Sequence, residues 1–234
     1  IGIIGCGKIA QVRHIPEYLE NKDACLAGFY DLNSDRAKEL AEKYNAKSYD
    51  SYGEMLADDD IDAVSVCAAN SVHAEITIAA LNAGKHVLCE KPMASNLKEA
   101  EEMFSEAEKQ NLILLEGMRS IYAPSFEKML PYMESLGKIR RATLQYCQYS
   151  SRYDNYKRGI IENAFKPELS NGALMDIGVY VVACMIRLFG APVSIKASGI
   201  KLSNGVDGAG TILMEYPDMI GAVSYTHLTL PTIA

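Results

Sequence analysis

The sequence lacks an excess of positive charge and has no long uninterrupted apolar run. Its formal net charge of -7 at pH 7 argues against nucleic-acid binding, because phosphate recognition needs a clustered positive surface. No run approaches about 18 apolar residues, and no basic-then-apolar leader opens the chain, so neither a membrane span nor secretion is indicated. A small molecule is therefore the expected partner.

The cysteines include no C-x-x-C pair, which argues against a thiol redox motif. Several of them lie in apolar strand-like runs, where reduced core thiols are usual. The six positions are Cys6, Cys25, Cys67, Cys89, Cys147 and Cys184. We therefore expect a cytoplasmic protein with reduced thiols, and we predict no bound metal.

The first part of the chain alternates apolar strand-like runs with helical patterns, which is typical of a doubly wound parallel sheet. The expected strands are 1–4, 24–30, 63–67, 86–89 and 113–116. The expected helices are 8–20, 35–44, 72–83 and 97–110. This pattern predicts a Rossmann dinucleotide-binding domain over residues 1–120.

After about residue 120 the pattern changes to long strands in which polar and apolar residues alternate. We expect strands at 138–149, 194–201, 208–216 and 219–222, with one helix at 172–188 between them. Such alternation suits an antiparallel sheet with one face in water. The predicted fold class is therefore α/β, with an α+β substrate domain over residues 121–222 that contains a predominantly antiparallel sheet.

A glycine-rich turn follows the first expected strand directly and opens the first expected helix. It consists of Gly5, Cys6, Gly7, Lys8, Ile9 and Ala10, in the pattern G-x-G-x-x-A. Gly5 permits the tight turn, Gly7 lets the backbone approach a pyrophosphate, and Ala10 allows close helix packing. The N–H groups of the helix start favour an anion. We therefore expect these six residues to bind a dinucleotide.

Asp31 ends the second expected strand, roughly 20 residues after the turn. A carboxylate there accepts hydrogen bonds from the ribose hydroxyls and repels a 2′-phosphate. The sequence therefore favours NAD as the cofactor and leaves NADP open.

The tripeptide Glu90-Lys91-Pro92 comes just after the expected strand 86–89. It therefore lies at the carboxyl edge of the sheet, where open α/β sheets bind their ligands. We expect Glu90 and Lys91 to contact the cofactor, and Lys91 to reach the substrate.

A third signal lies on the expected helix 172–188. A four-residue spacing puts Asp176, Tyr180 and Cys184 on one face, opposite an apolar face. An Asp in a mostly apolar helix costs free energy unless it is paired, and Lys91 is a candidate partner. A bland alternative is that Asp176 stabilises the helix dipole and that Tyr180 is ordinary core.

Three segments together resemble the glucose-fructose oxidoreductase, inositol dehydrogenase and rhizopine catabolism (Gfo/Idh/MocA) family. They are the turn Gly5–Ala10, the run 83–92, and the segment 172–180. The resemblance extends to about residue 222. It implies an NAD(P)-dependent dehydrogenase or reductase that transfers a hydride between the nicotinamide and a carbinol or ketone of a sugar, an inositol or a related diol.

The resemblance also implies site residues. In that family the Lys of E-K-P and an Asp followed one turn later by His or Tyr form the catalytic set, which here corresponds to Lys91, Asp176 and Tyr180. Either Tyr180 or Lys91 is then the immediate proton carrier. The family's loop T-P-N-x-x-H, which lies near the nicotinamide, is matched at Asn70 and His73, although Ala69 replaces the proline. The resemblance therefore implies that Asn70 and His73 bind the cofactor.

Further implications of the resemblance concern substrate and assembly. Donors to a small polyhydroxylated substrate are expected from Arg119, Arg152 and Lys166. The peptide between Lys91 and Pro92 is expected to be cis, and a full-length protein is expected to be a homo-oligomer.

Two other functions remain open within the same family. One is an NAD-using glycosidase, which oxidises and re-reduces its substrate and so releases sugar without net NADH. The other is a regulator that binds the dinucleotide without catalysis. An intact set of Lys91, Asp176 and Tyr180 argues against the regulator.

The segment 223–234 resembles a translated transposon-adapter sequence of the kind that contaminates gene sequences. We therefore expect it to be a non-native tail on an incomplete second domain. On this interpretation residues 223–225 extend the last strand through β-propensity alone, and residues 226–234 lack packed partners.

Resequencing the source gene across codon 222 tests this interpretation. We expect the genomic DNA to depart from the tail at about that codon and to continue the reading frame. A genomic sequence that encodes the same tail followed by a stop codon would contradict it.

Overall fold

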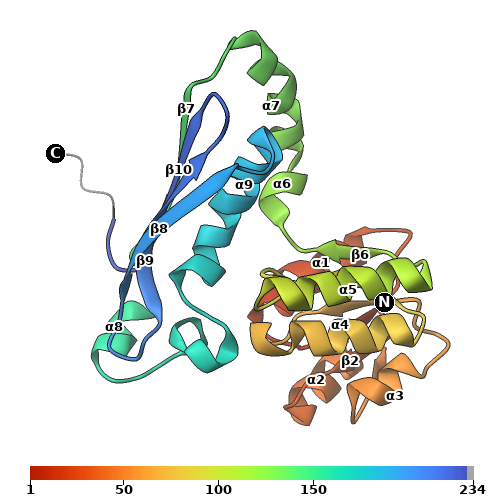
Figure 1. Ribbon diagram of the computed structural model, residues 1–234. Coiled ribbons are helices and arrows are strands. Elements are labelled where there is room, and N and C mark those ends of the chain that lie inside the picture. The colour runs from red at the N-terminus through yellow and green to blue at the C-terminus, as the bar shows by residue number, and fades with distance from the viewer. Residues whose placement is uncertain (231–234) are drawn as a thin grey trace. The chain divides into compact units, whose positions relative to one another are not determined.

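A six-stranded parallel sheet forms the first of two units, which meet in the chain between Gly117 and Met118 (Figure 1). The computed structural model describes residues 1–230. The strands are β1 (Gly2–Ile4), β2 (Gly28–Tyr30), β3 (Lys47–Ser48), β4 (Ala63–Val66), β5 (His86–Cys89) and β6 (Leu114–Glu116). Their order is β3-β2-β1-β4-β5-β6. The chain adds β2 and β3 on one side of β1 and then crosses over to add β4, β5 and β6 on the other side. Dinucleotides bind at such a reversal in Rossmann sheets.

Helices cover both faces of this sheet, as Figure 1 shows. They are a π-helical turn (Ala10–His14), α1 (Ile15–Glu20), α2 (Ser34–Tyr44), α3 (Tyr52–Leu56), a 3-10 turn (Asn70–Val72), α4 (His73–Asn82) and α5 (Leu97–Gln110). Ile3 packs in the core with α1 and α2, whereas its neighbour Ile4 packs in the core with α3, α4 and α5. Successive strand residues therefore fill opposite cores, which explains why the strands are apolar throughout.

The expected strand 24–30 is wrong in extent, because only Gly28–Tyr30 pairs as a strand. Residues 25–27 instead bond to the chain start: the Ile1 amino group donates to Cys25 O at 2.7 Å, and Ala27 N donates to Ile1 O at 2.9 Å. β3 and α3 have two and five residues. Elements this short give no periodic signal, which is why neither was predicted.

The second unit contains a mixed sheet with one helix along a face (Figure 1). Its strands are β7 (Arg141–Cys147), β8 (Ser194–Lys201), β9 (Asp207–Glu215) and β10 (Ile220–Thr226), in the order β7-β10-β9-β8. The β7 and β10 pair is parallel, and the other two pairs are antiparallel. The sheet is therefore predominantly antiparallel, as predicted.

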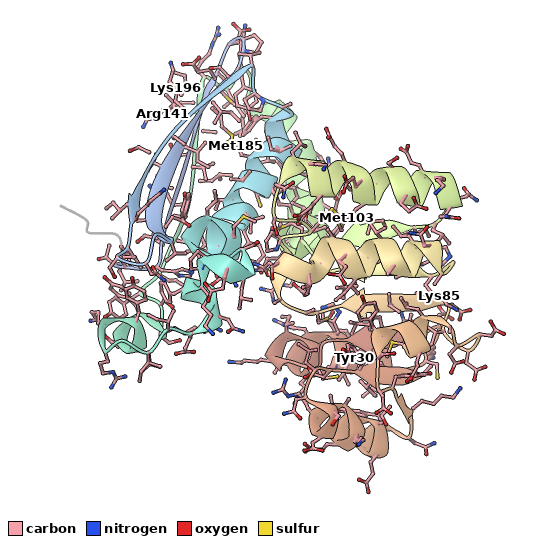
Figure 2. All side chains as sticks on the ribbon, turned by 60° about the horizontal axis from the view of Figure 1, so that its bottom comes forward. Tyr30, Lys85, Met103, Arg141, Met185 and Lys196 are labelled. Carbon is pink, nitrogen blue, oxygen red and sulfur yellow. The ribbon has the colours of Figure 1, made fainter. Side chains whose placement is uncertain are left out.

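The long helical segment of this unit is a π-helical turn (Leu174–Gly178) that leads into α9 (Val179–Phe189). Met185 lies fully buried between α9 and the sheet, where a Cβ on Gly221 would be 3.1 Å from its sulfur (Figure 2). The remaining helices are α6 (Arg119–Tyr122), α7 (Pro124–Ser135) and α8 (Tyr153–Lys157), with short 3-10 turns at Asn163–Phe165 and Pro167–Leu169. α7 was not predicted, and it contains Pro131, a residue that normally ends a helix.

The helical stretch Pro167–Phe189 is long and apolar enough to cross a membrane, with a mean hydropathy of 1.8 over its most apolar window. Its residues Ile177 and Met185 instead lie in the core against the second sheet. Core helices of globular proteins pass the same test of length and composition. The expectation that the protein does not insert into a membrane therefore stays a prediction.

β10 lies inside the second sheet, and this position corrects the expectation for the tail. Residues 223–225 do continue the last strand, as predicted. Tyr225 fits against two glycines, because a Cβ on Gly210 would be 2.3 Å from its hydroxyl and one on Gly178 would be 2.9 Å from its ring.

The prediction that residues 226–234 lack packed partners is wrong for the first three of them. The side chain of Leu228 packs on Gly208, where a Cβ would be 2.9 Å from it. Thr226 is 8% exposed, and His227 is 1% exposed with its ring against Phe165. The burial of these residues follows from the strand register. β10 pairs with β7 and β9 as far as Thr226, so the residue after it is still held against the core. Residues 231–234 of the expected tail lie outside the described residues.

Candidate active site

The glycine-rich turn follows β1 and leaves room for a ligand. Gly5 has φ +93°, and a Cβ there would be 2.7 Å from the backbone of Cys67 and Ala68. A Cβ on Gly7 would meet nothing within 4 Å. Ala10 is fully buried in the core beneath α1 and α2. The turn is therefore tight on its inner side and open at Gly7, which fits the close approach of a pyrophosphate.

The side chains of the remaining turn residues, Cys6, Lys8 and Ile9, form no part of the ligand site that we describe. Cys6 is fully buried, and burial raises the pKa of its thiol to about 12, with the Asp31 carboxylate adding to the effect. It is therefore an unreactive core thiol, although its amide faces Asp31. Lys8 and Ile9 are exposed.

Asp31, at the end of β2, is tied to the turn. Its Oδ2 accepts a hydrogen bond from Cys6 N at 2.7 Å, and its Oδ1 accepts one from Asn33 N at 2.8 Å. Arg36 on α2 donates from Nη1 to both oxygens at 3.3 Å. The Asp31 carboxylate, which is predicted to bind the ribose hydroxyls, is therefore held by three hydrogen-bond donors.

Glu90, Lys91 and Pro92 follow β5 at the same edge of the sheet. Glu90 N donates to Val66 O at 2.9 Å, which continues the β4–β5 ladder into the motif. The Lys91–Pro92 peptide is cis, as predicted. Glu90 Oε2 accepts from Lys91 N at 3.1 Å, and Glu90 Oε1 lies 2.7 Å from His14 Nε2. His14 was not singled out in the sequence, where one histidine in a helix gives no specific signal.

His73, expected near the cofactor, begins α4 and is 1% exposed. Its Nδ1 lies 2.9 Å from Pro92 O, and its Nε2 lies 3.1 Å from Ala68 O. Burial lowers its pKa, while the two carbonyl contacts act in the opposite direction. The ring therefore joins the loop after β4, which carries the half-buried Asn70, to the loop after β5.

Glu116, at the end of β6, is a further site residue that the sequence did not reveal. Its Oε1 accepts from Met93 N at 2.9 Å. Burial raises its pKa; the Met93 N–H lowers it, Glu90 raises it, and Lys91 lowers it. Two carboxylates and one lysine therefore interact electrostatically at this edge of the sheet.

Asp176 and Arg152 come together in the second unit. Asp176 lies in the π-helical turn, with its Oδ2 3.9 Å from Arg152 Nη1 and 3.0 Å from His227 Nε2. The π turn departs from the regular four-residue spacing assumed for Asp176 and Tyr180. Tyr180 lies on α9 with its ring centroid 5.8 Å from that of Tyr146.

The other expected substrate donors occupy different positions in this unit. Arg119 is exposed at the first residue of α6, and Lys166 is half-buried at the end of the 3-10 turn Asn163–Phe165. Their roles as substrate ligands stay predictions.

Comparison with known proteins gives the family. A model described as "Oxidoreductase family, NAD-binding Rossmann fold" matches residues 1–118, and one described as "GFO/IDH/MocA C-terminal domain" matches residues 133–232. The chain belongs to the Gfo/Idh/MocA oxidoreductase family. The second match includes residues 223–232, most of the segment expected to be non-native.

Two curated relatives within the Gfo/Idh/MocA family have named activities. The chain is 45% identical over 228 residues to the scyllo-inositol 2-dehydrogenase (NADP(+)) IolU of Bacillus subtilis, covering 97% of this chain and 69% of that protein. It is 32% identical over 207 residues to a trans-1,2-dihydrobenzene-1,2-diol dehydrogenase of Xenopus tropicalis, covering 86% and 60%. The chain thus spans about two thirds of the length of these relatives.

Solved structures share the arrangement of elements. The 3-ketoreductase KijD10 of Actinomadura kijaniata, in complex with NADP and TDP-benzene, has a TM-score of 0.85 at 26% identity, covering 96% of this chain and 69% of that chain. The WlbA dehydrogenase of Bordetella pertussis, with NADH and UDP-GlcNAcA, has a TM-score of 0.87 at 23% identity, covering 99% and 71%. The second of these likenesses concerns the fold alone.

The two glycines of the turn give a paired test. We expect Gly7→Ala to leave the free protein folded, because its Cβ enters open space, and to weaken dinucleotide binding roughly tenfold or more, since a methyl group stands where the pyrophosphate must approach. Gly5→Ala should instead lower thermal stability, because its Cβ overlaps backbone at a positive φ. Calorimetric titration with NADH and thermal unfolding measure both. Unchanged NADH affinity in Gly7→Ala would contradict the assignment of this turn to pyrophosphate binding.

Proposed function

We propose that the protein transfers a hydride between a nicotinamide cofactor and a carbinol or ketone carbon of a sugar, an inositol or a related diol. The observation that carries this proposal is the shared sheet edge in the first unit. The open turn at Gly7 follows β1, and Lys91 follows β5 of the same parallel sheet. The activities named for IolU and for the dihydrodiol dehydrogenase agree with this chemistry.

The bound nicotinamide would supply the hydride acceptor or donor at its C4 atom. The turn Gly5–Ala10 would hold the pyrophosphate through backbone N–H groups, and Asp31 would orient the adenosine ribose. Asn70 and His73 belong to the loop after β4, which we propose lines the nicotinamide end. In this arrangement His73 would position the two loops that carry Asn70 and Lys91, through its contacts with Ala68 O and Pro92 O.

Proton transfer to or from the substrate oxygen falls to Lys91 or Tyr180. Either side chain can serve as general acid or base, and such a group typically contributes 10² to 10⁴ in rate. We propose that Asp176 orients a substrate hydroxyl and that Arg152, 3.9 Å from it, balances its charge and donates to the same ligand. Arg119 and Lys166 would add donors for a polyhydroxylated substrate.

Replacing Lys91 tests the catalytic assignment. We expect Lys91→Met to lower kcat by about 10² to 10⁴, because a proton-transfer group is lost. The affinity for NADH should stay within about threefold, because the turn builds the phosphate cradle. Lys98→Met is the matched control, since Lys98 is 84% exposed on α5. A screen of inositols, sugars and diols with NAD and NADP identifies the substrate first.

Three outcomes would redirect the proposal. Near-normal kcat in Lys91→Met contradicts the role of Lys91. Sugar release from a glycoside without net NADH formation favours the glycosidase. Tight NADH binding with no turnover of any polyol, by a full-length protein as well as by this chain, favours the regulator.

For the cofactor we propose a preference for NAD with residual use of NADP. Asp31 repels a 2′-phosphate, whereas Arg36, whose side chain is 43% exposed, is a cation beside the same site. The relative IolU is named as an NADP-dependent dehydrogenase, which supports use of the phosphorylated cofactor as well. Arg36 would have to leave Asp31 to meet the phosphate.

Substitutions at this pair should move cofactor preference in opposite directions. Asp31→Ser should lower the NAD-to-NADP ratio of kcat/KM roughly tenfold or more, because the repelling charge is removed. Arg36→Ala should raise that ratio by weakening NADP use. Arg13→Ala, which removes a surface arginine paired with Glu17, is the control. If the ratio is the same in all four proteins, the pair does not select the cofactor.

We also propose that a full-length protein forms a cytoplasmic homo-oligomer through the second sheet. α9 covers one sheet face, and the side chains that alternate onto the other face include Thr143, Lys196, Thr211 and Ser224. This face lies opposite α9, and we propose that it packs against a second copy. All six cysteines are free thiols, which suits a reducing compartment.

A further inference from the structure

Glu116 is a carboxylate that the proposed mechanism does not use, and it ends β6 at the carboxyl edge of the first sheet. Residues of one strand alternate between the two faces of a sheet, so Glu116 shares its face with Leu114, which is buried in the core. Glu116 itself is half-buried, and burial raises its pKa. A carboxylate in such a place costs free energy unless a hydrogen-bond donor compensates for the lost water.

The donor to Glu116 is a backbone group of the loop after β5. Met93 N donates to Glu116 Oε1 at 2.9 Å. In the β5–β6 ladder Cys89 is the partner of Glu116, so their side chains lie on the same face of the sheet. Cys89 Sγ donates to Met93 O at 3.7 Å. The cross-strand pair of Cys89 and Glu116 therefore holds both backbone polar groups of Met93.

The loop is also held directly before Lys91, where Glu90 N donates to Val66 O at 2.9 Å. Gly117 brings the end of β6 close to the same residue. Its N donates to Cys89 O at 2.7 Å, and a Cβ on it would be 3.4 Å from the Cα of Glu90. Lys91 therefore lies between two anchored points of the loop, one held by β4 and the other by β6.

We propose that Glu116 is a positioning residue for Lys91, which it directs by holding the backbone of Met93. This inference rests on the proposed role of Lys91 in proton transfer. Glu116 acts on the backbone of the loop, whatever group the Lys91 ammonium contacts. Without the acceptor, the amide of the buried Met93 is left unpaired, and the loop shifts to bring it to water. A displacement of about 1 Å at a reacting group can cost on the order of 10² in rate.

Three substitutions separate this role from simple packing. Glu116→Gln keeps an oxygen that can accept from Met93 N and removes the charge, whereas Glu116→Met has nearly the same length and removes the acceptor. Glu99→Met is the matched control. Glu99 is another half-buried glutamate that accepts from a backbone N–H, that of Ser95 at 2.8 Å, but it does so at the start of α5. The control therefore loses the same kind of bond two residues further along the chain.

Hydrogen–deuterium exchange of the purified chain, followed by mass spectrometry, measures protection of the Met93 amide. Because Pro92 has no amide hydrogen, exchange at Met93 is resolved from exchange at Lys91. In Glu116→Met we expect this amide to exchange about tenfold faster or more. Once a substrate is known, kcat should fall about tenfold or more, with KM for the dinucleotide within about threefold. Glu116→Gln and Glu99→Met should stay within about threefold of the parent in both Met93 exchange and kcat.

The outcomes separate this inference from the proposed function. Parent-like Met93 exchange or parent-like kcat in Glu116→Met would overturn the positioning role. Equal losses of kcat in Glu99→Met would also overturn it, because general loosening of the segment would then explain them. A loss in Glu116→Gln as large as in Glu116→Met would overturn it too, since the charge and not the bond to Met93 would matter. If Lys91→Met keeps normal kcat, the proposed function fails, whereas Met93 exchange still decides whether Glu116 holds the loop.

Discussion

The candidate site depends on the way each parallel ladder continues one residue past its strand. Gly5 N donates to Tyr30 O, Cys67 N to Ile4 O, and Glu90 N to Val66 O, at 2.8, 2.7 and 2.9 Å. These bonds fix the first residue of each loop before the chain turns away. Because Gly5 has no side chain, the turn after β1 contacts the backbone of the loop after β4 directly. The glycine-rich turn and Lys91 therefore lie at one edge of the same sheet.

Much of the first unit could be predicted because its signals are local and repeated. β5 and α5 have the predicted bounds, and Asn96 caps α5 by accepting from Glu99 N. Strands buried on both faces are uniformly apolar, so the sequence marks them clearly. β3 and α3 are too short for such a pattern.

The contacts that organise the site could not be predicted, since they join residues far apart in the chain. His14 and Glu116 have nothing unusual in their own sequence neighbourhoods, and each acquires its place only when the sheet brings the loops together. The two π-helical turns also escape a periodic analysis that assumes 3.6 residues per turn. Each of them holds a site residue, His14 in one and Asp176 in the other. The pairing of Asp176 with Arg152 likewise depends on a loop fold without a regular pattern.

The order of strands in the second sheet has a consequence for how that unit assembles. β7 and β9 each pair with β10, which comes after both of them in the chain. β8 and β9 can pair as soon as they exist, but β7 must wait until β10 has been made. During synthesis on the ribosome, β7 therefore has no strand to pair with until most of the second unit has been made. Long-range closure of this kind is slow and leaves apolar surface exposed until the last strand has paired.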